Sequence, residues 1–390
     1  MITKLFLENF KCFKKQELRF SNLTLLTGVN SAGKSSIIQA LLLIKQTFEN
    51  AKEQVEDLYE IIKENKTLKN FSKKEIVCKL INDMIIKNAI TSGKYTQIHN
   101  PKSLLYDMAE TDDILLKFSI DLEELFFKID TKEKNDEEKL SIKIKNLNID
   151  SMSSLFSKEN FSYLSANRIT PAVTYLYSPN INDKQLGNEG EYSVHYLYSN
   201  KNKDISLKGL KEETAKTYSL LENVIKWLGR ISKGIDLKPN VDENLKICSL
   251  LYSYGGRELF PENVGFGITY SLPIILILLK ANKGDIVIIE NPESHLHPKA
   301  QVELARLCAK TSMEGVQIII ETHSDHFLNA IRVSIKEELI SENMVSIYFF
   351  NREGKNIDVT EIKIDKNGKI DKWPKGFFDE WDIQLEKLLW

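Results

Sequence analysis

The sequence predicts an α/β fold that contains a mixed β-sheet and a short inserted helical lobe. Three observations favour this class. A strand-like run, Leu23–Thr27, leads through a glycine-rich turn into an amphipathic helical stretch, Ser35–Phe48. Two further apolar runs, Asp285–Glu290 and Gln317–Glu321, have the length and isoleucine content of buried parallel strands. Between these two runs, Pro298–Ala309 has a helical pattern with proline in its first turn.

The first part of the chain alternates between strand and helix signals. Residues 1–27 carry apolar residues in short runs that predict strands. Residues 49–112 are polar, with apolar residues at helical intervals, which predicts two to four helices. Over residues 49–150 there are 17 Lys, no Arg and 21 Asp plus Glu, a balance of 17 − 21 = −4. The insertion is therefore not a basic DNA-binding arm, and a hairpin of about 30 residues per arm would reach only ~45 Å.

The middle of the chain returns to strand alternation over residues 113–165, with a polar turn at 131–139. Residues 170–210 are rich in loop signals. Helices are expected over Glu212–Leu228 and, interrupted near its start by Pro273, over Ile268–Lys280, with a strand at Ile247–Tyr254. This organisation predicts five consecutive segments: residues 1–48, 49–112 (the helical insertion), 113–250, 251–340 and 341–390.

Composition excludes several classes of protein. The 390 residues include 53 basic and 55 acidic side chains, and only seven of the basic ones are Arg. Since Arg is the usual reader of phosphates and guanine, a broad DNA-reading surface is not expected. The four cysteines form no C-x-x-C pair, and the longest apolar run, Leu272–Leu279, is far shorter than the ~20 residues of a membrane span. We therefore expect a soluble, cytoplasmic protein that does not contact a membrane.

The strongest motif is Gly28–Ser35, which matches the phosphate-loop pattern G-x-x-x-x-G-K-[ST] in full. Glycines let backbone N–H groups approach phosphate oxygens, and the following helix adds its positive dipole end. In this pattern Lys34 reaches the β- and γ-phosphates and the Ser35 hydroxyl ligates Mg²⁺. The sequence therefore predicts ATP and Mg²⁺ as ligands.

Acidic residues and a histidine follow the two apolar strands. Glu290 ends the first strand, where a carboxylate holds Mg²⁺ directly or through water in phosphate-loop folds. Glu293 lies just past Pro292 and is the candidate base that orients water; Glu321 is a weaker candidate. His323 follows the second strand, from where it can reach the γ-phosphate. The nearby pair His295 and His297 lacks a third ligand at a matching spacing, which favours a structural role.

A third feature opens the helix that precedes Glu290. Gly265-Phe266-Gly267 places two glycines at a helix N-terminus, which is typical of an anion site but is also common at strand-to-helix turns.

Together these motifs, in this order, resemble the ABC-type ATPases of the SMC-like and RecF-like branch. More narrowly, they resemble compact AAA-fifteen-type ATPases of bacterial defence islands. The resemblance covers residues 1–48 and 160–390. Further segments that carry it are Leu7–Phe13, Tyr163–Pro171 and the ending Trp373–Glu380, which is similar to a "WPxGFFDE" motif.

The resemblance implies an ABC-type head with three sources of nucleotide contacts. They are the phosphate loop, the turn after the first strand, which contains Lys11, and the segment at Gly265–Thr269 that takes the place of the ABC signature loop. The implied nucleotide-binding residues are Lys11, Gly28, Asn30, Ser31, Ala32, Gly33, Lys34, Ser35, Ser36, Gly265 and Gly267. Ser35 and Glu290 are the implied metal ligands, and Glu290, Glu293 and His323 the implied catalytic residues. Many relatives have Asp-Glu where this chain has Glu290-Asn291, which puts the rate of hydrolysis in question.

Three functions remain open from the sequence. The first is an ATPase switch in which two heads sandwich ATP, form a homodimer or larger oligomer, and control a separate effector, a nuclease or toxin, in anti-phage defence. The second is a scaffold that hydrolyses ATP slowly and uses it as a structural ligand. The third is a RecF-like DNA-repair ATPase, which the neutral charge and scarce Arg disfavour.

Overall fold

The computed structural model describes residues 1–62, 89–98, 100–120, 123–136, 139–145, 160–178 and 186–389. They fall into two compact units, each made from separate stretches of the chain. The first unit takes its described residues from 1–20, 31–157 and 352–358, and the second from 21–30, 158–351 and 359–390. The finer division into five consecutive segments stays a prediction.

The first unit is built on an antiparallel sheet with the strand order β2-β1-β5-β6-β7-β4. Apolar side chains on alternate positions of these strands point into its core, as at Ile114, Leu116 and Phe118. The strands are β1 (Ile2–Phe10), β2 (Phe13–Arg19), β4 (Ala89–Ile90), β5 (Asp113–Ile120), β6 (Glu123–Asp136) and β7 (Lys139–Lys145). The strands predicted for this part are confirmed, although β6 extends through most of the expected turn at 131–139.

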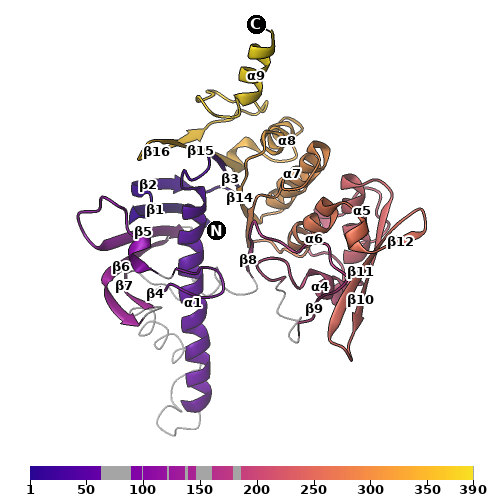
Figure 1. The fold of residues 1–390 in the computed structure, drawn as a ribbon, viewed down its shortest axis with the longest axis horizontal. Coiled ribbons are helices and arrows are strands. Elements are labelled where there is room, and N and C mark those ends of the chain that lie inside the picture. Colours follow the sequence, from indigo (N-terminus) through magenta and orange to yellow (C-terminus); the bar gives the residue numbers. More distant parts are fainter. Residues whose placement is uncertain are drawn as a thin grey trace. The chain divides into compact units, whose positions relative to one another are not determined.

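Helix α1 (Lys34–Ile62) runs along this sheet (Figure 1) and is longer than the predicted helix. The prediction of helices over 49–112 is correct only up to residue 62 and wrong for the later part that the structure describes. There the chain forms β4 and a short 3-10 helix, Pro101–Leu104. Ala89 pairs with Leu140 in β7, so the backbone here forms its hydrogen bonds within the sheet. This pairing overrides the helical spacing of the local sequence. The turn predicted around 65–72 lies outside the described residues.

The second unit contains the central sheet, with the order β16-β15-β3-β14-β13-β8. The neighbours from β15 to β8 all pair in parallel. The strands are β3 (Leu23–Gly28), β8 (Phe161–Leu164), β13 (Ile286–Glu290), β14 (Gln317–Glu321), β15 (Val345–Glu353) and β16 (Asn356–Ile362). The interior strands are apolar along their whole length because both of their faces are covered, so the predicted buried parallel strands are confirmed.

Helices and a smaller antiparallel sheet complete the second unit. They are α4 (Ser193–Asn200), α5 (Leu220–Ile231), α6 (Phe266–Leu279), α7 (Pro298–Met313), α8 (Asp325–Lys336), and β9 (Tyr175–Leu176), β10 (Ile235–Asp242), β11 (Ile247–Tyr254) and β12 (Arg257–Leu259). Helices α6 and α7 pack on the central sheet. Helix α6 continues through Pro273. The Pro273 ring packs against Gly190, and a Cβ on that glycine would lie 2.5 Å from the ring.

Two helices differ from their predictions. The stretch expected to be loop-rich contains α4, and α5 begins at Leu220 instead of Glu212. Side chains in the first turn of α5 explain the later start. The Glu222 carboxylate accepts hydrogen bonds from the N–H groups of Lys216 and Thr217, at 2.6 and 2.8 Å, which holds the preceding chain in a turn.

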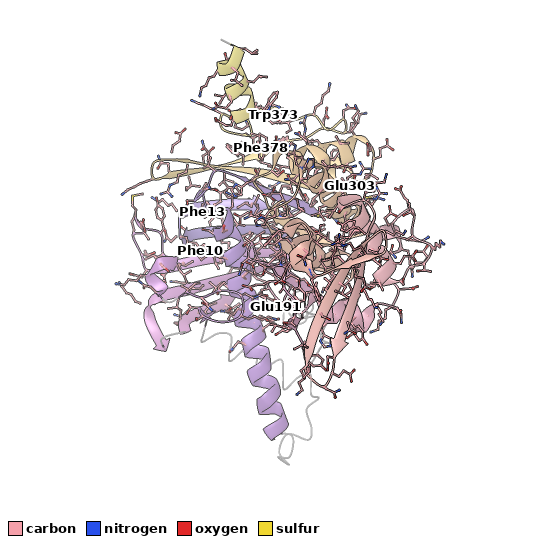
Figure 2. All side chains as sticks on the ribbon, turned by 45° about the vertical axis from the view of Figure 1, so that its right-hand side comes forward. Phe10, Phe13, Glu191, Glu303, Trp373 and Phe378 are labelled. Carbon is pink, nitrogen blue, oxygen red and sulfur yellow. The ribbon has the colours of Figure 1, made fainter. Side chains whose placement is uncertain are left out.

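The C-terminal segment follows β16 and ends in α9 (Glu380–Leu389). Figure 2 shows Trp373 and Phe378 near the start of this helix. Between them in sequence, Phe377 is fully buried and packs on Phe349, with ring centroids 5.2 Å apart, whereas Trp381 in α9 is exposed. Among the described residues no helix is both long and apolar enough to cross a membrane.

Candidate functional site

The strand register of the central sheet brings the predicted site segments to one edge. Glu290 at the end of β13 lies beside Glu321 at the end of β14, and Glu321 lies beside Leu26 of β3. Gly28, which ends β3, pairs with Phe350 of β15. The start of the phosphate loop and the segments that follow β13 and β14 therefore leave the sheet at the same carboxyl edge, where ligands bind in parallel α/β sheets.

The phosphate loop, residues 28–35, joins β3 to α1 and needs glycine at both of its fixed positions. Gly28 and Gly33 have φ angles of 134° and 99°. A Cβ on Gly28 would lie 2.0 Å from the carbonyl oxygen of Phe350, and one on Gly33 would lie 2.5 Å from the ring of Phe13. The backbone can take this path only without side chains at these positions, which is the close approach that a phosphate cradle requires.

The start of α1 supplies the charge for this cradle. The helix begins at Lys34, whose side chain is only 3 % exposed. The first N–H groups of a helix have no partner within it, and the positive end of the helix dipole lies at the same place. A glycine-lined loop that leads into a helix start and a buried lysine fits the phosphates of a nucleotide.

Lys11 and Arg352 also lie near the loop within the first unit. Lys11 occupies the turn between β1 and β2 with a φ of 51°, and its amine donates to the side-chain Oε1 of Gln39 on α1. Burial lowers the pKa of Lys11. Arg352 donates to the backbone oxygen of Ser31 at 3.2 Å. Sequence reasoning assigned no role to Arg352, because nothing local links residue 352 to the loop.

Glu290 is held by backbone and side-chain donors. Its Oε2 accepts the N–H of Ala166 at 3.0 Å, and the Tyr163 hydroxyl also hydrogen-bonds to it. Burial raises the pKa of this carboxyl above its ordinary value, while these two hydrogen bonds act in the opposite direction. Mg²⁺ is commonly held by one or two carboxylates together with substrate phosphates, so a single carboxylate at this edge fits that ion. No three His, Cys, Asp or Glu side chains gather into a metal site in the part of the chain that the structure describes.

Asn291 turns the chain away from β13 with a φ of 43°, a conformation that Asn tolerates better than most residues. Its N–H donates to the backbone oxygen of Glu321 at 2.7 Å, which ties the two strand ends together. The Asn291 Oδ1 is buried, and no hydrogen-bond partner for it is present among the described residues. A buried amide oxygen without a partner is costly and marks a position where a ligand or water can bind.

Glu293 bridges to the segment that follows β14. One carboxylate oxygen accepts the backbone N–H of His323 at 2.7 Å, and the other accepts the Thr322 hydroxyl at 2.9 Å. Burial raises the pKa of Glu293, and the hydrogen bonds partly offset this effect. The carboxylate thus positions the turn that carries His323, whose side chain is exposed at the same edge. The structure brings the predicted site residues Glu290, Glu293 and His323 to one edge of the sheet, and their catalytic roles stay a prediction.

Arg168 lies at this edge and holds the end of β13, a role that the sequence motifs did not predict. Its side chain is 2 % exposed and donates to the backbone oxygens of Ser165, Glu290 and Asn291 at 2.7, 2.6 and 2.6 Å. Its guanidinium also lies 4.2 Å from the ring centroid of Tyr270 in α6. The motif Tyr163–Pro171 contains Arg168, but its partners Glu290 and Asn291 are more than 100 residues away in sequence, so only the fold reveals these two contacts.

Gly265 and Gly267 lie at the start of α6, against the loop after β13. A Cβ on Gly267 would lie 2.4 Å from the backbone oxygen of His295, whereas one on Gly265 would meet only Ile268, at 4.0 Å. The ring of Phe266 lies 4.5 Å from that of His295. His295 therefore packs the start of α6 against this loop. His297 caps α7 by accepting a hydrogen bond from the N–H of Lys299 at 3.3 Å. Gly265 stays exposed at the surface.

Comparison with known proteins agrees with this geometry. Residues 1–328 match the model of the AAA ATPase domain family of AAA-fifteen type, and residues 340–388 match a family described as a protein of unknown function, DUF3696. No curated protein matches the chain.

Solved structures of SMC head domains share the fold. The SMC head bound to the C-terminal winged-helix domain of ScpA has 14% identity, a TM-score of 0.54, and coverage of 94% of this chain and 98% of its own. The SMC head from Pyrococcus furiosus, with an extended coiled coil and bound to the C-terminal domain of ScpA, has 12% identity, a TM-score of 0.52 and coverage of 100% and 99%. The mixed α/β head predicted from the motifs is thus confirmed. Since the family model covers most of the chain, including every predicted nucleotide-site segment, this chain belongs to the AAA ATPase domain family.

Proposed function

We propose that this protein binds and hydrolyses ATP with Mg²⁺ and works as a nucleotide-driven switch. One observation carries the proposal: a glycine-lined phosphate loop begins at the same sheet edge at which Glu290, Glu293 and His323 are gathered. The family match supports ATP as the nucleotide.

The proposed roles follow from the chemistry of each residue. The loop amides and Lys34 bind the phosphates, and Ser35 and Glu290 are the Mg²⁺ ligands that the motifs assign. When bound, Mg²⁺ would neutralise part of the negative charge of the phosphates. Glu293 accepts the proton of the attacking water. Each of its oxygens already accepts one hydrogen bond but has a second lone pair, and its raised pKa suits a base that works near neutral pH. His323 contacts the γ-phosphate.

We further propose that ATP brings two copies of the chain together through Gly265–Thr269. Gly265 and Phe266 are exposed at the N-terminus of α6, where the helix dipole favours an anion such as a γ-phosphate on the opposite copy. Opening and closing of such a dimer would control a separate effector, a nuclease or toxin. The resemblance of Trp373–Glu380 to the ending of defence-island ATPases supports an anti-phage setting for this control.

A scaffold with slow hydrolysis is the second candidate, and two observations favour it. Asn291 stands where many relatives have a carboxylate, and an amide cannot accept a proton at neutral pH. The Glu293 carboxylate already holds the turn at Thr322 and His323. In this case ATP would stabilise the assembly without rapid turnover. A RecF-like role on DNA lacks comparable support, because the charge of the chain is close to neutral.

The two candidates are separated by Glu293→Gln, compared with Asn291→Ala. For the switch we expect Glu293→Gln to keep ATP binding, to lower turnover at least ~100-fold and to trap the ATP-bound dimer. Asn291→Ala should have a smaller effect. Turnover is measured by phosphate release and assembly by light scattering, each with ATP and Mg²⁺. Parental turnover in Glu293→Gln together with loss in Glu321→Gln would move the role of base to Glu321. If the unmodified protein binds ATP but hydrolyses it very slowly, the scaffold is favoured.

A further inference from the structure

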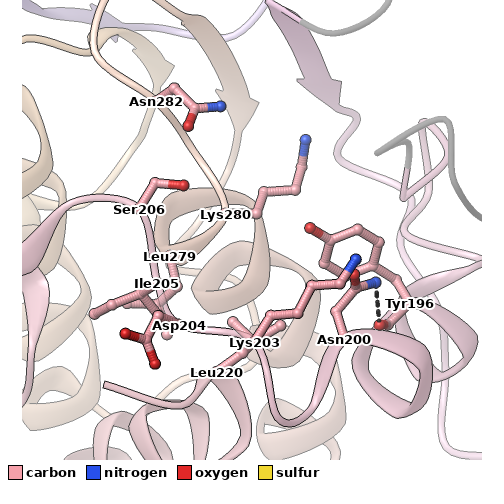
Figure 3. A pocket seen from close by; sticks show the side chains of 10 residues that line it. All are labelled: Tyr196, Asn200, Lys203, Asp204, Ile205, Ser206, Leu220, Leu279, Lys280 and Asn282. Carbon is pink, nitrogen blue, oxygen red and sulfur yellow. Dashed lines mark hydrogen bonds between the residues drawn. The ribbon is translucent and has the colours of Figure 1, made fainter. Parts of the chain in front are cut away.

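The second unit contains a cavity of about 190 Å³ that is separate from the predicted nucleotide site (Figure 3). It lies between α4, the chain that follows α4, the start of α5 and the end of α6. Its polar lining includes Asn200, Lys203, Lys280 and Asn282, and its apolar lining includes Leu220 and Leu279.

The cavity lies at the opposite edge of the central sheet from the nucleotide site. Lys280 follows the last residue of α6, and its amine donates to the hydroxyl of Ser162, which is near the beginning of β8, at 3.1 Å. Asn282 precedes β13, whose amino end pairs with that part of β8. Since these strands are parallel, their amino ends share one edge and the segments around Glu290 lie at the other.

Two amines make this cavity attractive to an anion. Lys203 is exposed, and none of the carboxylates in the described ranges forms an ion pair with it. In Figure 3 the side chains of Lys203 and Lys280 extend toward the same side of the cavity, the side on which the Tyr196 ring lies. The acidic group in the lining, Asp204, is neutralised by Lys208 at 2.8 Å. The two cavity lysines therefore give the lining a net positive charge.

The remaining lining suits a ligand that has an uncharged body. Leu220 is 4 % exposed and Leu279 is fully buried, so their side chains form a fixed apolar wall. The Tyr196 side chain is buried as well, and its backbone oxygen holds the Asn200 amide at 2.9 Å. A small number of fixed polar groups around an apolar wall is the usual composition of a small-molecule site.

We propose that this cavity binds a small phosphorylated molecule, with its phosphate between Lys203 and Lys280 and its less polar part against Leu220 and Leu279. Lysine amines are good phosphate binders because they act as compact positive charges with several donors.

The test is isothermal titration of the full chain with AMP and with pyrophosphate, in buffer without Mg²⁺. The parent for this test carries Lys34→Ala, so that the phosphate loop contributes as little as possible. Lys203→Gln is the main variant because this side chain is exposed and forms no ion pair with a residue that the structure describes, so its loss should leave the fold intact. Lys233→Gln, which removes an exposed lysine outside the cavity, is the matched control.

We expect saturable binding of at least one probe, weakened tenfold or more by Lys203→Gln and unchanged by Lys233→Gln. Lys280→Gln should weaken the same binding, and circular dichroism checks that this variant folds. The proposal is overturned if neither probe binds with a Kd below about 1 mM, the weak end of measurable affinity. The proposal is also overturned if the Lys34→Ala parent binds the probe with the same affinity whether or not it also carries Lys203→Gln. Neither outcome bears on ATP hydrolysis at the other edge, so failure here leaves the proposed function intact.

Discussion

Removal of the Arg168 side chain should strongly destabilise the second unit. The guanidinium donates to three backbone oxygens, at 2.6 to 2.7 Å, and is almost completely buried. Hydrogen bonds that involve a charged group contribute about 1.5–3 kcal/mol each, and a buried oxygen left without its donor adds a desolvation cost. The desolvation of Arg168 itself, which also lowers its pKa, offsets part of this sum.

We therefore expect Arg168→Met to cost about 3 kcal/mol in the free energy of unfolding. For a unit of 150–250 residues this corresponds to a fall in Tm of roughly 6–12 °C. Arg257→Met, in the exposed strand β12, removes the same side chain from a surface position and should change Tm little. Differential scanning calorimetry of the two variants and the parent measures the difference.

The variant should also lose turnover beyond its loss of stability. Arg168 binds the backbone oxygens of Glu290 and Asn291, so its removal allows both residues to shift. Phosphate release measured well below the lowered Tm separates this effect from unfolding. A Tm for Arg168→Met equal to that of Arg257→Met would refute the view that Arg168 fixes the end of β13.

Three more predictions concern the same edge. Lys34→Ala should abolish ATP binding in a fluorescent-nucleotide titration because phosphate charge in the loop is then poorly compensated; unchanged affinity would contradict this. Gly267→Ala should lower Tm because its Cβ would lie 2.4 Å from a backbone oxygen. Gly265→Ala should not, because its Cβ would make only an ordinary contact with Ile268 at 4.0 Å, and equal Tm values would contradict the packing argument. Burial raises the pKa of Glu290 and Glu293 in the folded protein, so their contribution to stability is fully present below pH 4.5 and is lost as pH rises through the raised pKa. The stability of the parent relative to Glu290→Gln should therefore fall in thermal unfolding as the pH rises above 4.5. A difference that does not depend on pH would contradict the assignment.

The segments that carry the nucleotide edge could be predicted because their signals are local. The β13 and β14 strands are short runs of isoleucine and valine that end in Glu, and the glycine spacing of the phosphate loop is set by the backbone it must adopt. Parallel pairing then places the ends of these strands together, so Glu290, Glu293 and His323 could be expected at one edge without knowledge of the rest of the fold.

Features that depend on distant contacts could not be predicted. The contacts of Arg168 with the carbonyls of Glu290 and Asn291, and the closeness of Phe13 to Gly33, join residues whose sequence neighbours give no hint of the pairing. Helix α4 was missed because prolines and glycines surround it in sequence, although Val194 and Leu197 bury its apolar face. The start of α5 was misplaced because the Glu222 side chain, not the apolar pattern, decides where the helix begins.

The central claim is that this chain hydrolyses ATP, with Lys34 of the phosphate loop as a phosphate-binding residue and Glu293 after β13 as the base. The most direct test is steady-state phosphate release by the purified chain with ATP and Mg²⁺, with Lys34→Ala and Glu293→Gln measured alongside it. The account predicts saturable turnover that disappears in Lys34→Ala and falls at least ~100-fold in Glu293→Gln while ATP binding by the second variant persists. Turnover that is the same in all three proteins, or a parent chain that binds no ATP, would contradict it.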